Sequence, residues 1–227
     1  MVAPMRFFLS LVLAITLVHP VAQADAAIFG SRETAYQDLS YFPKWTGMIA
    51  RSLTGEIGTR TSPKKRSICK RNPRFACPEE EWKTFIAAMK SQQIAGPALL
   101  RRVNQHLNRA AYVQDPINWG VPDFWAHALE FLQRNGDCED YAISKYATLK
   151  RLGVPTQSMR VVVLEDLNLD LAHAVLSVEM EGTWYILDNQ IRTVLPDDAI
   201  VHYQPVYSIN EHGWWMHRSS GSALPGR

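Results

Sequence analysis

The chain has 227 residues, of which 47% are hydrophobic and 20% are charged, and its formal net charge is +2. That length and apolar content suffice for one domain with a substantial core. The small net charge argues against a nucleic-acid partner, which a strongly basic chain would favour.

The first 24 residues have the layout of a cleaved secretory signal. Arg6 precedes an apolar run over residues 7–18, and an Ala-Gln-Ala sequence closes the segment. The run is shorter than the roughly 20 apolar residues that cross a bilayer. We therefore expect an exported chain that starts near Asp25 or Ala27 and has no stable membrane insertion after cleavage.

Residues 25–76 are predicted to be an N-terminal extension with a basic loop. Trp45 and its apolar neighbours indicate a short helix, and a turn-rich stretch with Lys-Lys-Arg at residues 64–66 follows. We expect a solvated loop there, and a docking surface for an acidic partner is the alternative. Cys69 and Cys77 are close in an exported chain, so we predict a disulfide, with free thiols as the alternative.

A single enzyme domain is predicted over residues 77–218, followed by a tail at 219–227 with the composition of a disordered segment. Pro78 followed by three glutamates starts a helix, and Gly96-Pro97 starts a second one, each with an apolar stripe. Further along the chain, β-branched and aromatic runs predict strands. The expected fold class is α+β, with helices ahead of an antiparallel sheet.

An irregular segment rich in Asp, Asn, Pro and Gly covers residues 112–124. Trp119 and Trp125 flank its last proline, and they either pack over the next helix or wall a substrate cleft. His127 follows shortly afterwards and is a rival candidate for a catalytic base.

Residues 135–142 read Asn-Gly-Asp-Cys-Glu-Asp-Tyr-Ala and place a cysteine at a predicted helix start. A helix N-terminus favours the thiolate, which is the nucleophilic form of Cys138. The carboxylates of Asp137, Glu139 and Asp140 oppose this by like-charge repulsion unless a bound cation neutralises them. Taken alone, a buried structural cysteine beside capping acids fits the pattern as well.

Two strands are predicted at residues 172–178 and 183–188, joined by a loop at 179–182. In that register His173 faces Asp188 directly, and opposed residues share one face with Cβ atoms about 4.5–5.5 Å apart. An imidazole beside a carboxylate forms a general base with its orienting group, which needs only a nucleophile from elsewhere.

The order of cysteine, histidine and aspartate resembles the transglutaminase-like branch of the papain superfamily. More narrowly, three stretches resemble the bacterial transglutaminase-like cysteine proteinases, whose characterised members are periplasmic proteases of the LapG type. They are Trp-Gly-Val-Pro-Asp-Phe-Trp at 119–125, Glu-Phe-Leu at 130–132 and Gly-Asp-Cys-Glu-Asp-Tyr-Ala-Ile at 136–143. The similarity runs from about Tyr112 to Asp188.

The resemblance implies a papain/transglutaminase-like fold and a catalytic triad of Cys138, His173 and Asp188. It also implies Ca²⁺ as cofactor, with Asp137 and Glu139 as ligands and Asp140 as a further one. Such an enzyme is expected in the periplasm, where it cuts a large surface adhesin near a paired-alanine site and releases biofilm cells. A cyclic di-GMP-sensing inner-membrane receptor is the expected regulatory partner.

Three alternatives share these residues. A transglutaminase-type amide acyltransferase would use the same triad, and a catalytically inactive peptide-binding module would keep the cleft without needing the thiol. The third alternative is a zinc site made of Cys138, His173 and Asp188.

Overall fold

The computed structural model describes residues 27–54 and 77–219, and within them seven strands form one antiparallel sheet in the order β1-β7-β6-β2-β3-β4-β5. The predicted signal segment, the basic triplet at 64–66, Cys69 and residues 220–227 lie outside the described residues. The strands are β1 (Arg32–Tyr36), β2 (Met159–Asp166), β3 (Leu171–Met180), β4 (Thr183–Leu187), β5 (Leu195–Pro196), β6 (Tyr203–Ile209) and β7 (Trp214–Arg218).

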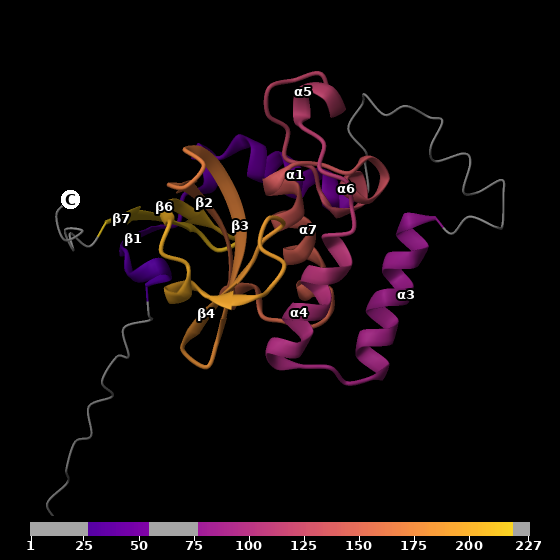
Figure 1. The fold of residues 1–227 in the computed structure, drawn as a ribbon. Helices are drawn as coiled ribbons and strands as arrows, with labels where there is room; N and C mark the ends of the chain where they lie inside the picture. Colours follow the sequence, from indigo (N-terminus) through magenta and orange to yellow (C-terminus); the bar gives the residue numbers. More distant parts are fainter. Residues whose placement is uncertain (1–26, 55–76, 220–227) are drawn as a thin grey trace, which may run out of the picture.

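Helices gather on one face of this sheet (Figure 1). They are α1 (Pro43–Thr54), α3 (Pro78–Ser91), α4 (Gly96–Leu107), α5 (Asp115–Asn118), α6 (Ala128–Arg134) and α7 (Cys138–Arg151). Helix α7 packs directly on β3 and β2. The larger core lies between the helices and the sheet, and it includes Trp45, Leu100, Phe131, Leu149 and Leu176. Within the described ranges, no helix has both the length and the apolar character needed to cross a bilayer.

The opposite face of the sheet carries a smaller core. Ile28, Val175, Trp184, Ile200 and Tyr203 form it, under two short 3-10 helices, η1 (Ile28–Gly30) and η4 (Asp197–Ala199). Because β2 and β3 are buried on both faces, their sequences are nearly continuous apolar runs without polar alternation. Two further 3-10 turns are η2 (Leu39–Tyr41) and η3 (Thr156–Ser158).

The α+β class and the helix starts at Pro78, Gly96 and Cys138 are confirmed. Residues 27–54 differ from the predicted extension, because they are integrated into the domain. Strand β1 pairs with β7 along its length, and α1 inserts Trp45 into the larger core with 1% exposure. The integration follows from the apolar face of α1, which would otherwise be left in water.

The predicted hairpin register is wrong by two residues. The turn consists of Glu181 and Gly182 alone, and Met180 pairs with Thr183. Both turn residues have positive φ, 54° and 79°, as a type I′ turn requires. A two-residue turn of this kind suits the right-handed twist of the strands, so β3 extends two residues further than expected. A shift by two keeps each side chain on its face.

Candidate active site

Cys138 is the first residue of α7, as predicted. Asn135 precedes it with a positive φ of 64°, and Asp137 is the extended N-cap residue. Between them, Gly136 has no room for a side chain, because a Cβ atom there would overlap the carboxyl group of Asp140. The glycine therefore lets the turn lie against a buried carboxyl group and directs the cysteine to the helix N-terminus.

A preceding segment fixes this turn by hydrogen bonds. The Tyr141 hydroxyl donates to the carbonyl of Ala110 at 2.6 Å, and the Val113 N–H donates to the carbonyl of Gly136 at 2.9 Å. The Asp115 N–H donates to Oδ2 of Asp137 at 3.3 Å. These contacts hold the 110–115 segment beside the cysteine turn. The hydrophobic periodicity of the sequence does not predict them.

His173 and Asp188 form a buried hydrogen-bonded pair, with 2.9 Å between Nε2 and Oδ1 and only 3% and 1% exposure. They are not directly opposed, because the corrected register, extended past Leu187, places Asp188 opposite Val175. His173 is two residues from Val175 on the same face, so the pair is diagonal. The contact between the two residues was predicted, although through the wrong register.

Two further groups hold the Asp188 carboxyl. Tyr203 donates its hydroxyl to Oδ2 at 2.6 Å, and the Gln190 N–H donates to Oδ1 at 2.8 Å. Burial alone would raise the pKa of Asp188, but the hydrogen bonds from His173 and Tyr203 outweigh it and lower that pKa. The group therefore stays ionised and holds the proton of His173 on Nε2. The Nδ1 atom is left as the acceptor, 3.4 Å from the Gln190 side-chain amide.

The Cys138 thiol lies against β3, next to the residue that follows His173. The backbone N–H of Ala174, the residue after His173, hydrogen-bonds to the sulfur, and the thiol itself donates to Oε2 of Glu139 at 3.2 Å. Burial, followed by the charge of Glu139, raises the pKa of Cys138 far above its usual range. With these neighbours alone the sulfur stays a thiol, so the helix terminus does not suffice to ionise it.

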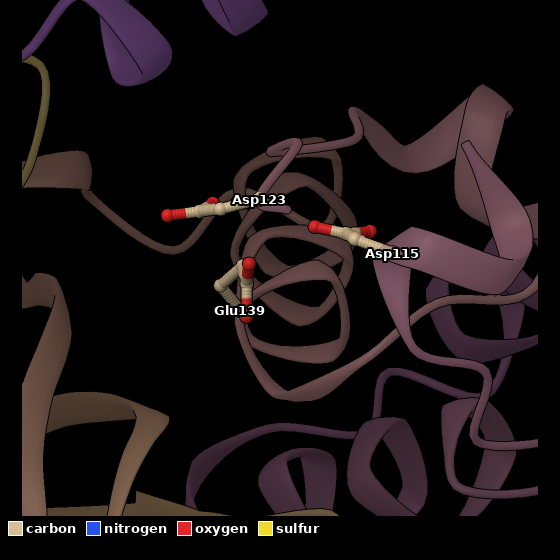
Figure 2. Close-up of side chains that lie close together, drawn as sticks. All are labelled: Asp115, Asp123 and Glu139. Carbon is tan, nitrogen blue, oxygen red and sulfur yellow. The ribbon is translucent and has the colours of Figure 1, made fainter. Parts of the chain in front are cut away.

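Five carboxyl groups cluster beside the thiol. One oxygen each from Asp115, Asp123 and Glu139 lies within 4.8 Å of the others, and the same holds for Asp115, Asp137 and Asp140. Figure 2 shows the first three approaching one another from α5, from the following loop and from the start of α7. Asp115 belongs to both groups and therefore sits at the centre of the cluster.

Burial and mutual repulsion raise the pKa values of four of these acids. Burial raises the pKa of Asp115 to about 7 and that of Glu139 to about 8, and it also raises the pKa values of Asp137 and Asp140. Three buried oxygens have no hydrogen-bond partner among the described residues: Oδ1 of Asp115, Oδ1 of Asp137 and Oδ2 of Asp140. Carboxylate oxygens that are buried, close together and unpaired fit a hard cation such as Ca²⁺.

The predicted metal ligands Asp137, Glu139 and Asp140 all lie in this cluster, but they do not form one group of three. Asp115 and Asp123 were missed, because they join the cluster only through the fold. Their Asp-rich segment was visible in the sequence, yet nothing there linked it to the cysteine turn. Cys138, His173 and Asp188 are not among the groups of close metal-binding atoms in the described residues, which argues against the zinc alternative.

The remaining predicted residues have structural surroundings. Trp125 is 7% exposed and packs edge-on against Trp45 in the larger core. Trp119 is 3% exposed and lies between the guanidinium of Arg134 and another aromatic ring. A role of either indole as a cleft wall stays a prediction. His127 is the N-cap of α6, where its Nδ1 accepts the Leu129 N–H at 3.2 Å.

Two of the three cysteines lie within the described residues. Cys138 is a free thiol, whereas Cys77 is disulfide-bonded. Its predicted partner, Cys69, lies outside the described residues.

Comparisons with known proteins give a consistent result. The sequence model of the bacterial transglutaminase-like cysteine proteinases matches residues 61–221. Among solved structures, LapG from Legionella pneumophila is 34% identical with a TM-score of 0.55, over 65% of this chain and 82% of that one. Its calcium-bound form is 33% identical with a TM-score of 0.53, over 65% and 84% of the two chains. The search of curated proteins gave no match.

Proposed function

Because the chain belongs to the bacterial transglutaminase-like cysteine proteinase family, we propose that it is a calcium-dependent periplasmic endopeptidase. Its proposed substrate is the N-terminal region of a large surface adhesin, cut near a paired-alanine site, so that adhesin release promotes biofilm dispersal. An inner-membrane receptor that senses cyclic di-GMP is the proposed inhibitor, acting by sequestration. The LapG relatives support the enzyme class, and the layout of residues 1–24 supports export.

One observation carries the proposal: the free thiol of Cys138 contacts the backbone N–H of Ala174, the residue after His173, and His173 is hydrogen-bonded to Asp188. This placement supports the proposal that Cys138 is the nucleophile, His173 the base and Asp188 the orienting acid.

The proposed reaction is acyl transfer to the thiol. His173 accepts the thiol proton on Nδ1 while Asp188 holds the proton on Nε2. The sulfur of Cys138 attacks a peptide carbonyl, the amine leaves with the proton returned by His173, and water then hydrolyses the thioester. The Cys138 backbone N–H has no intrahelical acceptor at the start of α7, so it can donate to the carbonyl oxygen as negative charge develops there.

The carboxyl cluster is the proposed calcium site. Asp115 would hold the ion together with Asp123 and Glu139 or with Asp137 and Asp140, the two groups whose oxygens lie close together. When bound by these carboxylates, Ca²⁺ would offset the negative charge that opposes thiolate formation at Cys138.

The test is cleavage of an adhesin N-terminal fragment that carries the paired alanines. We expect wild-type protein to cut it with calcium and not with excess chelator, and we expect Cys138→Ala to be inactive in both conditions. Incorporation of an added amine without cleavage would instead identify an acyltransferase. Binding without either reaction would identify a peptide-binding module.

Asp115 provides a sharper test of the metal site, because it does not touch the thiol. We expect Asp115→Asn to raise the calcium concentration that gives half-maximal activity by at least about tenfold, as removal of one charged ligand should. Asp198→Asn makes the same charge change at an exposed residue of η4 and is the matched control. An equal calcium requirement in the two variants would exclude Asp115 as a ligand.

A further inference from the structure

A cavity with two arginines lies on the α4 side of the molecule, apart from the carboxyl cluster. It has a volume of about 420 Å³ and is lined by Arg101, Gln105, Asn108, Arg192 and Thr193. Arg101 and Gln105 lie one turn apart on α4, whereas Arg192 and Thr193 come from the loop after β4. Two parts of the fold therefore bring these side chains to one cavity.

The cavity presents donors and positive charge. Each of its described lining side chains carries an N–H or O–H group, and none of them is acidic. No ion pair with a described carboxylate involves Arg101 or Arg192, and both arginines are exposed. Guanidinium groups on one cavity repel each other until an anion lies between them. A carboxylate matches the planar fork of a guanidinium and can also accept from the amides.

The cavity shares its loop with the proposed active site. Asn108 donates its side-chain amide to the backbone carbonyl of Asp188 at 2.7 Å, and Asn104 donates to the carbonyl of Arg192 at 3.3 Å. Helix α4 thus holds both ends of the segment from Asp188 to Arg192. The loop from Asp188 to Arg192 therefore connects the cavity to the residue proposed to orient His173.

We propose that this cavity is a subsite for an acidic side chain of the protein substrate. The inference rests on the proposed function, because it concerns how the same enzyme selects its peptide. An Asp or Glu carboxylate of the substrate would lie between Arg101 and Arg192, with the Gln105 amide as a further donor.

The test compares two charge-matched double variants with wild-type protein on the adhesin fragment, in saturating calcium. R101Q/R192Q removes the two guanidiniums of the cavity. R102Q/R109Q removes two exposed arginines in or just after α4 that do not line it. We expect R101Q/R192Q to raise KM about tenfold, the loss of charge-assisted hydrogen bonds at a partly exposed site, with kcat within about twofold of wild type. We expect the control variant to keep the wild-type KM.

A second fragment tests whether the increase in KM of R101Q/R192Q depends on an acidic side chain of the substrate. In it, every Asp and Glu near the cut site is replaced by Asn or Gln, and we expect wild-type protein and R101Q/R192Q to cut it with equal KM. Equal KM values for the two double variants on the original fragment would overturn the inference. A defect of R101Q/R192Q that persists on the neutral fragment would overturn it as well. If wild-type protein cuts neither fragment, the proposed function itself fails.

Discussion

Asp188 is the residue proposed to orient His173, and three groups hold its carboxylate. It accepts hydrogen bonds from an imidazole, a phenol and a backbone N–H, and it is 1% exposed. Its carboxylate therefore has no freedom to rotate away from His173. The phenol of Tyr203 is the contact that a substitution can remove without disturbing the imidazole.

We expect Tyr203→Phe to lower kcat about five- to tenfold with little change in KM, because one hydrogen bond to an ionised group is lost. Tyr185→Phe removes a hydroxyl from β4, the strand next to β3, and is the control. Steady-state kinetics on the adhesin fragment provide the measurement. A wild-type kcat in Tyr203→Phe would mean that His173 and the backbone orient Asp188 without the phenol.

Lys145 is a buried charge that the proposed mechanism does not use. It lies two turns after Cys138 on α7, is 0% exposed, and its Nζ has no hydrogen-bond partner among the described residues. Burial lowers its pKa to about 7, against a small opposing effect of Asp188. The ordinary pKa is 10.5, so between about 7 and 10.5 the unfolded chain holds a proton that the folded chain has lost. The burial cost is therefore full below about pH 7 and disappears towards pH 10.5.

We expect Lys145→Met to increase the free energy of unfolding by roughly 2 kcal/mol at pH 6, with a smaller gain at pH 9. Urea unfolding at the two pH values measures this. Lys150→Met removes an exposed charge from the same helix and should change the stability by less than about 1 kcal/mol. A Lys145→Met variant that is less stable than wild type at pH 6 would contradict the account.

The sequence was sufficient for residues whose chemistry depends on local pattern. Cys138 follows a glycine turn at a helix start, His173 lies on β3, and Asp188 directly follows β4. Asp115, Tyr203 and Gln190 were not predicted as site residues, because only tertiary contacts bring the first two to the site. Gln190 lies opposite His173 only in the corrected hairpin register.

At the scale of elements, the β3–β4 hairpin shows how a register error can leave a predicted side-chain contact intact. The expected loop of four residues became a turn of two, which moved Asp188 by two positions relative to β3. An even shift preserves the face of the sheet, and a diagonal pair remains within reach of an imidazole. A shift by one residue would have put the pair on opposite faces.

Substitutions at the two turn residues should change the stability of the protein in opposite directions. Asparagine tolerates positive φ better than glutamate, so we expect Glu181→Asn to increase the free energy of unfolding by about 0.5–1 kcal/mol. We expect Gly182→Ala to decrease it by about 1 kcal/mol, although a Cβ atom there meets no neighbour, because φ is 79°. Thermal or urea unfolding measures both. If neither substitution moves the midpoint, the turn has a different conformation in solution.

At the scale of the whole molecule, the carboxyl cluster lies where three separate segments of the chain meet. Segment 115–123 and the start of α7 meet there, and α1 contributes the Lys44–Asp123 ion pair. The fold therefore concentrates negative charge at the junction of three segments. Without a cation, ionisation of these acids should lower the free energy of unfolding, because their negative charges repel one another.

Calcium is expected to stabilise the protein more at high pH than at low pH. The folded-state pKa values of Asp115 and Glu139, about 7 and about 8, lie above their ordinary values of 3.8 and 4.5. The folded chain thus binds protons that the unfolded chain has released, so stability without calcium falls as the pH rises from about 4 to about 8.

We expect one fixed calcium concentration, about 100 times the Kd at pH 8, to raise Tm by roughly 5–10 °C at pH 8 and by much less at pH 5, where protonated carboxyl groups bind calcium more weakly. Thermal unfolding with calcium and with chelator measures the difference. An equal increase of Tm with calcium at both pH values would mean that the carboxyl cluster does not bind the ion.

The pairing of β1 with β7 also has a consequence for biosynthesis. Arg32–Tyr36 is the first described strand of the chain, and its partner Trp214–Arg218 is the last. The edge of the sheet therefore cannot close while the chain is still emerging from the ribosome, because the partner of β1 has not yet been made. Strand β1 therefore stays unpaired at the edge of the sheet until residues 214–218 have left the ribosome, and an unpaired strand is open to pairing with another chain during that time.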